Sequence, residues 1–379
     1  MLYILNCIFD DKFVDGIINS FDLTSTYCHH DYVIIGDGLT KQFKYIKQSD
    51  KIHLVNRSNF ISLLNEGNYD AIIIHGLKQE MIDLLLQIDK KIVIIWKAWG
   101  FDIYTSPHVY ASFIRLQLYK PLTKKAIRKK ASYYLREVHG YLHYLKRLNI
   151  IHKAISRIDF FSGVLHCEYD LMSRLEYFKA GEVYLPYISL KENTLHTTNN
   201  HDNILIGNSN DPSNNHLDAF NYLKFVNIGD RKIYCPLSYG GTDIYREKVI
   251  EAGKQYWGDN FIPLIELLPE QEYMKIIDSC EIAIFYHERQ QAIGNITHVL
   301  RNGCSVYLSP TSINYKELSN IGFKVFDITQ DLESLLTLND REKINNKELC
   351  EKTASKQSFI ESVFDMYDKI SNKRNMFFD

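Results

Sequence analysis

The sequence lacks the features of a membrane-spanning or secreted protein. None of its apolar stretches approaches the roughly 20 residues that a transmembrane helix needs, so any membrane contact must be peripheral. The start, residues 1–11, has no basic leader and no small-residue cleavage site, and this is not the pattern of a signal peptide. We therefore expect a protein that stays in the cytoplasm.

Cysteine usage points the same way. The seven cysteines are odd in number, contain no C-x-x-C pair and mostly lie inside apolar runs. Cysteine in such runs behaves as a small hydrophobic residue. We expect reduced core thiols rather than disulfides or a zinc site.

Length and composition describe a globular chain of two domains. The 379 residues are two to three times the usual size of one domain. Apolar residues make up 45% and charged residues 24%, which excludes a largely disordered chain. The net charge of -2 by itself suggests neither a nucleic acid nor a membrane as partner, but the charge is unevenly spread.

Short apolar runs alternate with polar helical stretches in both halves. Runs of β-branched residues without polar alternation are typical of strands buried on both faces of a parallel sheet. In the first half they are residues 2–9, 32–35, 52–55, 71–74 and 92–96, and in the second 203–206, 232–237, 261–267, 282–286, 305–308 and 323–326. This rhythm predicts an α/β protein with two Rossmann-like domains, at residues 1–190 and 203–355. Residues 191–202 form the linker, and a helix at 356–379 is expected to pack back on the first domain.

The middle of the chain, residues 108–160, is helical and basic. Between Arg115 and Arg157 stand twelve Lys or Arg and one Glu, so this segment carries +11 and the rest of the chain -13. Its apolar residues recur at steps of three and four, which line one face of a helix: Ile127, Ala131, Tyr134, Val138, Tyr141, Leu145 and Leu148. One interpretation is a surface helix that contacts anionic lipid through Lys124, Lys125, Arg128, Lys129 and Lys130. The other is an ordinary amphipathic helix with a solvated basic face. Nucleic acid is a poorer interpretation, because no other motif supports it.

Three polar loops in the second half follow predicted strands and lead into helices, where doubly wound sheets bind ligands. A glycine permits close backbone approach, and the N–H groups that open a helix can receive an anion. The planar guanidinium of Arg289 suits a phosphate. The candidate ligand contacts are Gly207, Asn208, Ser209, Asp211, Ser213 and Asn214 in the first loop, Tyr239, Gly240 and Gly241 in the second, and Arg289, Gln290, Gln291, Gly294 and Asn295 in the third. Together they predict a pyrophosphate and sugar pocket, whereas the first loop alone also fits a capped surface loop.

These loops resemble a known family. The runs ILIGNSNDPSNNH at 204–216, PLSYGG at 236–241, EY at 272–273 and AIFYHERQQAIGN at 283–295 look like the bacterial 4-acetamido-4,6-dideoxygalactose (Fuc4NAc) transferases of enterobacterial common antigen synthesis. The resemblance is specific over residues 203–308 and looser at WKAWGFDIY, residues 96–104.

The resemblance implies a GT-B glycosyltransferase that moves a Fuc4NAc-like sugar from a dTDP carrier to a polyprenyl-diphosphate-linked oligosaccharide. The donor nucleotide sugar is then bound by the C-terminal domain, including Glu272, and the acceptor by the N-terminal domain, with His75, Trp99 and Tyr104 as candidates. The enzyme is expected on the inner face of the bacterial cytoplasmic membrane, as a peripheral protein.

A bound metal is not expected. GT-A transferases hold a divalent cation with Asp-x-Asp, and no two aspartates here lie two positions apart. Helix N-termini and Arg289 would then neutralise the leaving diphosphate. Histidines 75, 287 and 298 are further candidates to touch substrate, and His287 is the first of them.

The catalytic base depends on stereochemistry, which the sequence leaves open. If the configuration inverts, a base in the N-terminal domain must take the acceptor proton, and Asp102 is the first candidate. If it is retained, the departing phosphate can accept the proton and Asp102 positions the acceptor. Asp102 also fits a purely structural role, the capping of a turn.

Other functions remain open at this point. A GT-B transferase that uses a UDP- or GDP-linked sugar, or a non-hydrolysing sugar-nucleotide epimerase, would share the two-domain architecture. A non-catalytic scaffold would bind no nucleotide. A dehydrogenase is disfavoured, because Gly36-Asp37-Gly38-Leu39-Thr40-Lys41 lacks the third glycine of the dinucleotide fingerprint.

Overall fold

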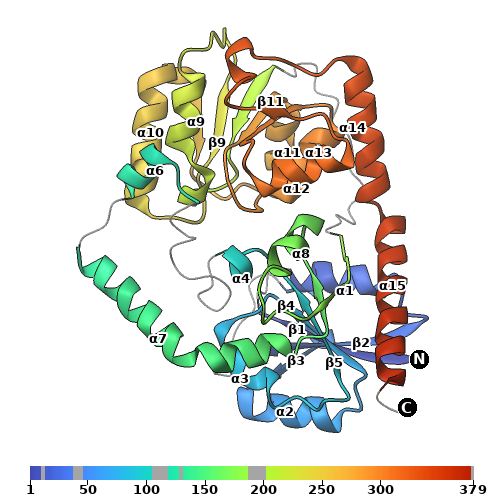
Figure 1. Cartoon of the computed structure of the whole chain (residues 1–379). Coiled ribbons are helices and arrows are strands. Elements are labelled where there is room, and N and C mark those ends of the chain that lie inside the picture. The colour runs from blue at the N-terminus through green and yellow to red at the C-terminus, as the bar shows by residue number, and fades with distance from the viewer. Residues whose placement is uncertain (10–12, 37–45, 105–117, 128–130, 187–201, 377–379) are drawn as a thin grey trace. The chain divides into compact units, whose positions relative to one another are not determined.

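The chain folds into two compact units that do not follow the sequence halves. The computed structural model describes residues 1–9, 13–36, 46–104, 118–127, 131–186 and 202–376 (Figure 1). Unit 1 comprises Met1–Ser112, Arg136–Leu190 and Lys356–Asp379, and unit 2 comprises Phe113–Leu135 and Lys191–Ser355. A segment from the middle of the first half therefore belongs to unit 2.

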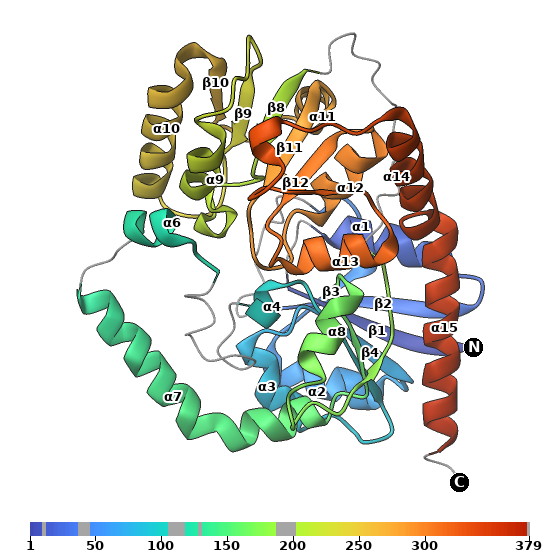
Figure 2. The ribbon, with the colours of Figure 1, turned by 45° about the horizontal axis from the view of Figure 1, so that its top comes forward.

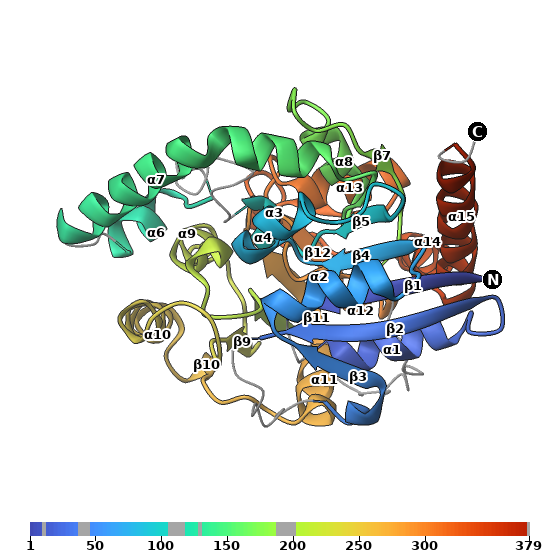
Figure 3. The same ribbon diagram turned by 90° about the horizontal axis from the view of Figure 1, so that it is seen from below.

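Unit 1 is built on a parallel sheet with the strand order β3-β2-β1-β4-β5-β6-β7. Figure 3 shows β3, β2, β1, β4 and β5 following one another in that order. The strands are β1 (Leu2–Ile8), β2 (Cys28–Ile35), β3 (Ile52–Val55), β4 (Ala71–His75), β5 (Val93–Lys97), β6 (Phe160–Ser162) and β7 (Gly181–Glu182). The helices are α1 (Val14–Asp22), η1 (Ser49–Lys51), α2 (Arg57–Glu66), α3 (Gln79–Leu85), α4 (Phe101–Tyr104), α8 (His166–Met172) and α15 (Lys356–Asn375), and α7 (Ala131–Ser156) begins in unit 2 and ends in unit 1.

Unit 2 is built on a second parallel sheet with the order β10-β9-β8-β11-β12-β13. Its strands are β8 (Asn203–Ile206), β9 (Ile233–Pro236), β10 (Phe261–Leu264), β11 (Cys280–Phe285), β12 (Ser305–Leu308) and β13 (Phe326–Asp327). Its helices are α6 (Pro121–Ala126), η2 (Pro212–Asn214), α9 (His216–Leu223), α10 (Asp243–Trp257), η3 (Gly258–Asn260), α11 (Glu270–Asp278), α12 (Ile293–Arg301), α13 (Ile313–Ile321), η4 (Leu332–Ser334) and α14 (Asp340–Thr353).

Both faces of the unit 2 sheet are covered by helices. Phe220 of α9 and Val249 of α10 pack in the core on one face. Ile296 of α12 and Leu318 of α13 pack in the core on the other face, and Figure 2 shows these two groups of helices on either side of the strands. This is why the strand sequences are apolar without alternation.

Each sheet has one point at which the strand order reverses. In unit 1 the reversal lies between β1 and β4, and in unit 2 between β8 and β11. The loops that follow two such strands diverge to opposite faces and leave a crevice, where open α/β sheets bind their ligands. In unit 2 these are the loops at 207–215 and 286–292.

The C-terminal helix α15 completes the core of unit 1. Its apolar face packs against α1 and the sheet through Phe359, Val363, Met366, Tyr367 and Ile370. The Tyr367 hydroxyl lies 2.8 Å from Thr24 Oγ1 and 2.8 Å from His30 Nε2. All three side chains are mostly buried, so the hydroxyl joins polar groups that water does not satisfy.

Two further observations concern the cysteines and the hydrophobicity of the helices. All seven cysteines are buried and unpaired. Among the helices in the described part of the chain, none is long and apolar enough to span a bilayer.

Tyr367→Phe should destabilise unit 1, because it leaves the buried Thr24 hydroxyl and His30 Nε2 without this partner. We expect a loss of about 1–3 kcal/mol in the free energy of unfolding, measured with urea. Tyr27→Phe is the matched control, since Tyr27 is 63% exposed and keeps its ring contact with Phe364. Equal stabilities of the two variants would contradict the prediction.

Candidate active site

The first loop of unit 2 turns sharply after β8. Gly207 has φ +71°, and a Cβ there would lie 2.7 Å from His216 Nε2. Asn214 Oδ1 accepts the Asn208 N–H at 3.1 Å, while Asn214 Nδ2 donates to the Ser209 carbonyl. Gly207 is therefore needed for the packing of the loop on the start of α9.

The second loop packs directly on the first. Gly241 has φ +58°, and a Cβ there would lie 2.2 Å from the Asn210 carbonyl oxygen. The Asn210 backbone N–H donates to Tyr239 O at 2.7 Å, and its side-chain amide donates to Gly240 O. The glycine pair thus serves contact between loops. Asn210 lies inside the polar run of the first loop but is not among the contacts predicted from the sequence.

The third loop joins the same network. The Ser213 hydroxyl lies 2.7 Å from Asp211 Oδ1 and from Gln291 Oε1, and Gln291 Nε2 donates to Asn208 Oδ1 at 2.9 Å. Arg289 Nε donates to the Ser213 hydroxyl at 3.3 Å. The structure therefore brings together the candidate residues of the first and third loops at the strand reversal.

Arg289 and the start of α12 give this edge its positive character. Arg289 Nη1 donates to Gln290 O at 3.1 Å, and the guanidinium is half-buried. In the part of the chain that the structure describes, no partner of Arg289 Nη2 is found. The helix α12 begins directly after Ala292, which has φ +60°, so the N–H groups of Gly294 and Asn295 belong to its first turn. Unpaired donors of both kinds suit an anion.

The remaining donor candidates lie near this edge. Asn295 Nδ2 donates to the Tyr273 hydroxyl at 2.9 Å, which connects α12 to α11. Glu272 is exposed in the first turn of α11. Gln290 is buried, and Tyr239 is 50% exposed with its hydroxyl accepting from Asn208 Nδ2.

His287 is fully buried and differs from the charged groups that a diphosphate would attract. Burial lowers the pKa of His287 to about 3, so its imidazole is neutral at pH 7. The same cause lowers the pKa of His216, beside Gly207, to about 3. His298 pairs instead with Asp278, at 2.7 Å. His287 therefore offers a neutral ring and no positive charge.

Asp102 is wholly buried in unit 1 and holds a turn. Its carboxylate accepts the indole N–H of Trp96 at 2.6 Å and the backbone N–H groups of Leu77 and Trp99 at 2.9 Å. Burial raises its pKa, against these hydrogen bonds. A carboxylate with three internal donors and no exposed surface fits the capping role better than the role of a base.

Of the candidate acceptor residues, His75 and Tyr104 are buried and Trp99 is partly buried. His75 Nε2 lies 3.1 Å from Asn6 Oδ1, and burial lowers the pKa of His75 to about 3. Trp99 packs on Phe13 with ring centroids 4.2 Å apart, and Tyr104 is 6% exposed. These residues lie near the carboxyl ends of β4 and β5, so they share one sheet edge.

Lys97 and Glu168 are ionisable groups at the same edge that sequence reasoning missed. Lys97 Nζ is buried and donates to Ser162 Oγ at 3.2 Å and to the carbonyls of Gly163 and Leu185. Burial lowers the pKa of Lys97 to about 8 and raises that of Glu168 to about 7. Lys97 could have been found from the sequence, because it ends the apolar run of β5. No sequence pattern distinguishes Glu168.

The basic segment divides between described and undescribed residues. Lys124 and Lys125 are exposed on α6. Arg128, Lys129 and Lys130 lie outside the described residues. Residues Lys120 to Ile127 pack on unit 2, where Ala126 and Ile127 contact the core.

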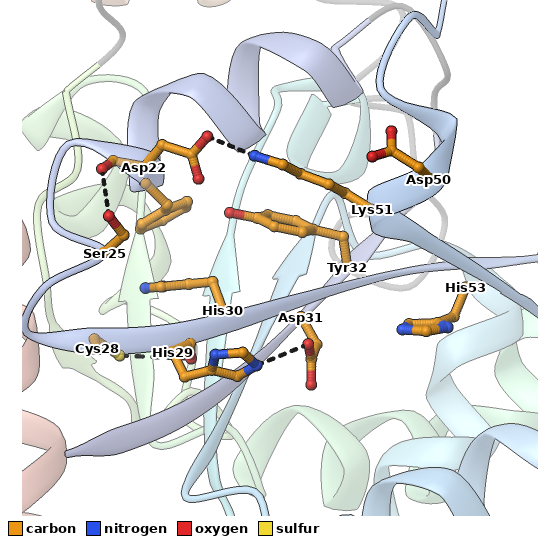
Figure 4. Close-up of a pocket in the computed structure, with 11 residues that line it drawn as sticks. Asp22, Ser25, Cys28, His29, His30, Asp31, Tyr32, Asp50, Lys51 and His53 are labelled. Carbon is orange, nitrogen blue, oxygen red and sulfur yellow. Dashed lines mark hydrogen bonds and ion pairs between the residues drawn. The ribbon is translucent and has the colours of Figure 1, made fainter.

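A pocket of about 380 Å³ lies elsewhere in unit 1, between α1, the first residues of β2, η1 and β3 (Figure 4). The Asp22 carboxylate pairs with Lys51 at 2.8 Å across it, and His29 pairs with Asp31. It is at the amino end of β2, whereas ligands of such sheets bind at the carboxyl ends. The candidate active site is therefore the loop network of unit 2.

Comparisons with known proteins show the family and the fold of this chain. The profile of the 4-alpha-L-fucosyltransferase family, glycosyl transferase group 56, matches residues 54–352. The chain belongs to this family. The group 56 match spans all three loops of unit 2 and most of unit 1.

Solved structures show the fold of this group 56 protein. A glycosyltransferase from Rickettsia africae is similar with a TM-score of 0.65 and 12% identity, covering 97% of this chain and 98% of that chain. Anabaena HepE in complex with UDP and glucose has a TM-score of 0.65 and 9% identity, over 97% and 100%. The lipopolysaccharide outer core galactosyltransferase WaaB has a TM-score of 0.59 and 12% identity, covering 97% of this chain and 100% of that chain. The fold is GT-B, and the group 56 protein is a glycosyltransferase, as predicted.

Glu168→Gln should flatten the pH dependence of stability. Between the ordinary carboxyl pKa and about 7, the folded protein keeps a proton on Glu168 that the unfolded chain has lost, so stability falls as pH rises. Relative to wild type, the variant should gain about 2 kcal/mol of unfolding free energy between pH 5 and pH 7.5. Urea unfolding at both pH values measures this difference, with the exposed Glu176→Gln as control. Parallel pH profiles of Glu168→Gln and wild type would contradict the prediction.

Proposed function

We propose that this protein transfers a deoxy-acetamido sugar of the Fuc4NAc type from a dTDP carrier to a polyprenyl-diphosphate-linked oligosaccharide. The observation that carries the proposal is the network of three loops at the strand reversal of unit 2. It gathers Asn208, Ser213, Gln291 and Arg289 at the position where α/β sheets bind nucleotides. The fucosyltransferase family and the resemblance of the loop sequences support the choice of a 6-deoxy sugar.

The chemistry of the donor site follows from its charges. The bond between the anomeric carbon and the diphosphate oxygen lengthens until the sugar resembles an oxocarbenium ion, and negative charge develops on the diphosphate. Arg289 and the N–H groups that open α12 stabilise that charge. The buried neutral His287 contributes shape and hydrogen bonding rather than charge. We propose that the reaction needs no bound metal.

We propose that unit 1 binds the acceptor, whose hydroxyl attacks the anomeric carbon. Asp102 is committed to its turn, so for an inverting reaction we assign the base to another group at the same sheet edge. For a retaining reaction the departing phosphate accepts the proton. His75, Trp99 and Tyr104 then shape the acceptor region as packed side chains.

Arg289→Ala should abolish or strongly weaken dTDP binding while the fold stays intact. Loss of a hydrogen-bonded charge corresponds to about a tenfold to hundredfold loss of affinity. Calorimetric titration with dTDP, UDP and GDP measures this loss of affinity. It also identifies which nucleobase the donor site prefers. Arg246→Met is the matched control, because Arg246 lies on α10 of the same unit and pairs with Asp243. Unchanged dTDP affinity in Arg289→Ala would contradict the donor site.

We also propose that the protein binds an anionic membrane surface through α6 and α7. Val138, Leu142 and Leu145 are 55%, 51% and 42% exposed, and their spacing of four and three places them on one face of α7. The exposed Lys146 and Lys153 lie beside this stripe. The buried Ile151, Ala154 and Ile155 hold the opposite face of the helix in unit 1. An exposed apolar stripe with lysines beside it is typical of an interfacial helix.

The membrane proposal predicts binding to vesicles of equal parts phosphatidylglycerol and phosphatidylcholine at low salt. The double variant Leu142→Gln/Leu145→Gln should have a partition coefficient about tenfold lower than that of wild type. Charge reversal at Lys124, Lys125, Arg128, Lys129 and Lys130 should lower it as well. Leu267→Gln is the control, because Leu267 is 68% exposed and lies between β10 and α11 of unit 2. The proposal fails if wild type does not sediment with these vesicles or if charge reversal leaves sedimentation unchanged.

A further inference from the structure

The segment from Leu118 to Ile127 comes from the first half of the sequence but is built into unit 2. We call these ten residues the strap. One side chain of α9 and one of α10 satisfy polar groups of its backbone. Asp218 accepts the N–H groups of Leu122 at 2.9 Å and Thr123 at 2.8 Å, together with the Thr123 hydroxyl at 2.7 Å. Lys248 of α10 donates to the carbonyl of Ala126 at 2.6 Å.

Asn215 connects the strap to the first and third loops. It is fully buried with φ +53°, and its Oδ1 accepts the Lys120 N–H at 2.8 Å. Its Nδ2 lies within hydrogen-bond distance of three carbonyl oxygens, those of Leu118, Ser213 and Tyr286, which share its two N–H donors. One amide therefore touches the strap, the first loop and the end of β11.

A second contact runs from the strap to the third loop. The Lys120 ammonium pairs with Glu288 at 2.6 Å and lies 5.0 Å from the centroid of the Tyr286 ring. Glu288 also accepts the hydroxyls of Ser309 and Thr311. The two charged side chains are 24% and 15% exposed, so water screens the pair only partly.

Glu288 is the neighbour of Arg289, the residue that we assign to the diphosphate. The Glu288 carboxylate binds the Lys120 ammonium and two hydroxyl groups, and these contacts fix the backbone of the third loop next to Arg289. The Arg289 guanidinium is directed by the same backbone and by Ser213. Lys120 thus acts on the donor through Glu288 and the loop.

We infer that Lys120 and Glu288 are positioning residues for the donor nucleotide, contributed as an ion pair between the strap and the third loop. This inference rests on the proposed function, because it concerns the same donor site. The strap is part of the basic segment, and this inference gives it a role in nucleotide affinity in addition to any role at a membrane surface.

The test is a double-mutant cycle on dTDP affinity in the full-length protein. Lys120→Met and Glu288→Gln should each weaken dTDP binding by about tenfold. The double variant should be no weaker than either single variant, because the pair acts as one unit. Lys254→Met is the control, since Lys254 is exposed on α10 and takes part in neither contact. Its dTDP affinity should equal that of wild type.

Backbone hydrogen exchange separates positioning from simple folding. In Lys120→Met, exchange should rise over residues 286–292 and stay unchanged in α10. Faster exchange with unchanged dTDP affinity would show a purely structural contact and overturn the inference. Additive losses in the double variant would overturn the pairing. If wild type itself binds none of the three nucleotides, the proposed function fails, whereas normal wild-type binding with unaffected variants refutes only this inference.

Discussion

The buried amide of Asn215 is the contact on which the donor edge of unit 2 depends. It satisfies backbone carbonyls from three segments that are far apart in sequence, and each would otherwise lose a partner in the core. Asn tolerates the left-handed backbone at φ +53°, where its side chain turns toward those carbonyls. The loop after β8, the end of β11 and the strap are consequently fixed against one another. The strand reversal provides the crevice, and Asn215 fixes the loops that line it.

Burial decides which side chains at the two sheet edges carry charge. His75, His216 and His287 are enclosed, and their pKa values fall to about 3, so they are neutral at physiological pH. A neutral imidazole cannot offset a diphosphate. The half-buried Arg289 keeps its charge because a guanidinium does not lose its proton in a protein. Among the described residues of the three loops, Arg289 supplies the positive side-chain charge and the opening turn of α12 adds to it. Under the proposed function, the third loop therefore carries most of the electrostatic stabilisation of the diphosphate.

The sequence predicts the strands well and the tertiary contacts poorly, and the reason is physical. Strands β3, β8 and β12 match the predicted runs 52–55, 203–206 and 305–308, because burial on both faces leaves a continuous apolar signature. The polar loops after β8, β9 and β11 can also be recognised in the sequence, since each follows an apolar run and leads into a helix. The two-residue strand β7 and the three-residue β6 have no comparable run.

Roles that depend on which residues meet in space are a different matter. Asp102 follows a strand exactly where a catalytic carboxylate would, yet three internal donors surround it. Glu168 lies in an ordinary helical stretch, and its raised pKa comes mainly from burial, with a further contribution from the nearby Asp102. The strap was predicted as part of the first domain because its sequence neighbours are there. Asp218 and Asn215, nearly a hundred residues later, hold it in unit 2.

The net charge of +11 over residues 115–157 overstates the positive surface that a lipid would meet. Lys120 is paired with Glu288, Arg147 with Asp83 and Arg157 with Asp159. The described lysines left exposed are Lys124, Lys125, Lys146 and Lys153, and each contributes about 1 kcal/mol near an anionic surface. Four such contributions give weak binding that salt screens readily. Under the membrane proposal, the apolar stripe of Val138, Leu142 and Leu145 supplies the part of the attraction that salt does not weaken, because apolar burial is insensitive to screening. Membrane binding by this protein should therefore persist in part at high salt, which a purely basic patch would not allow.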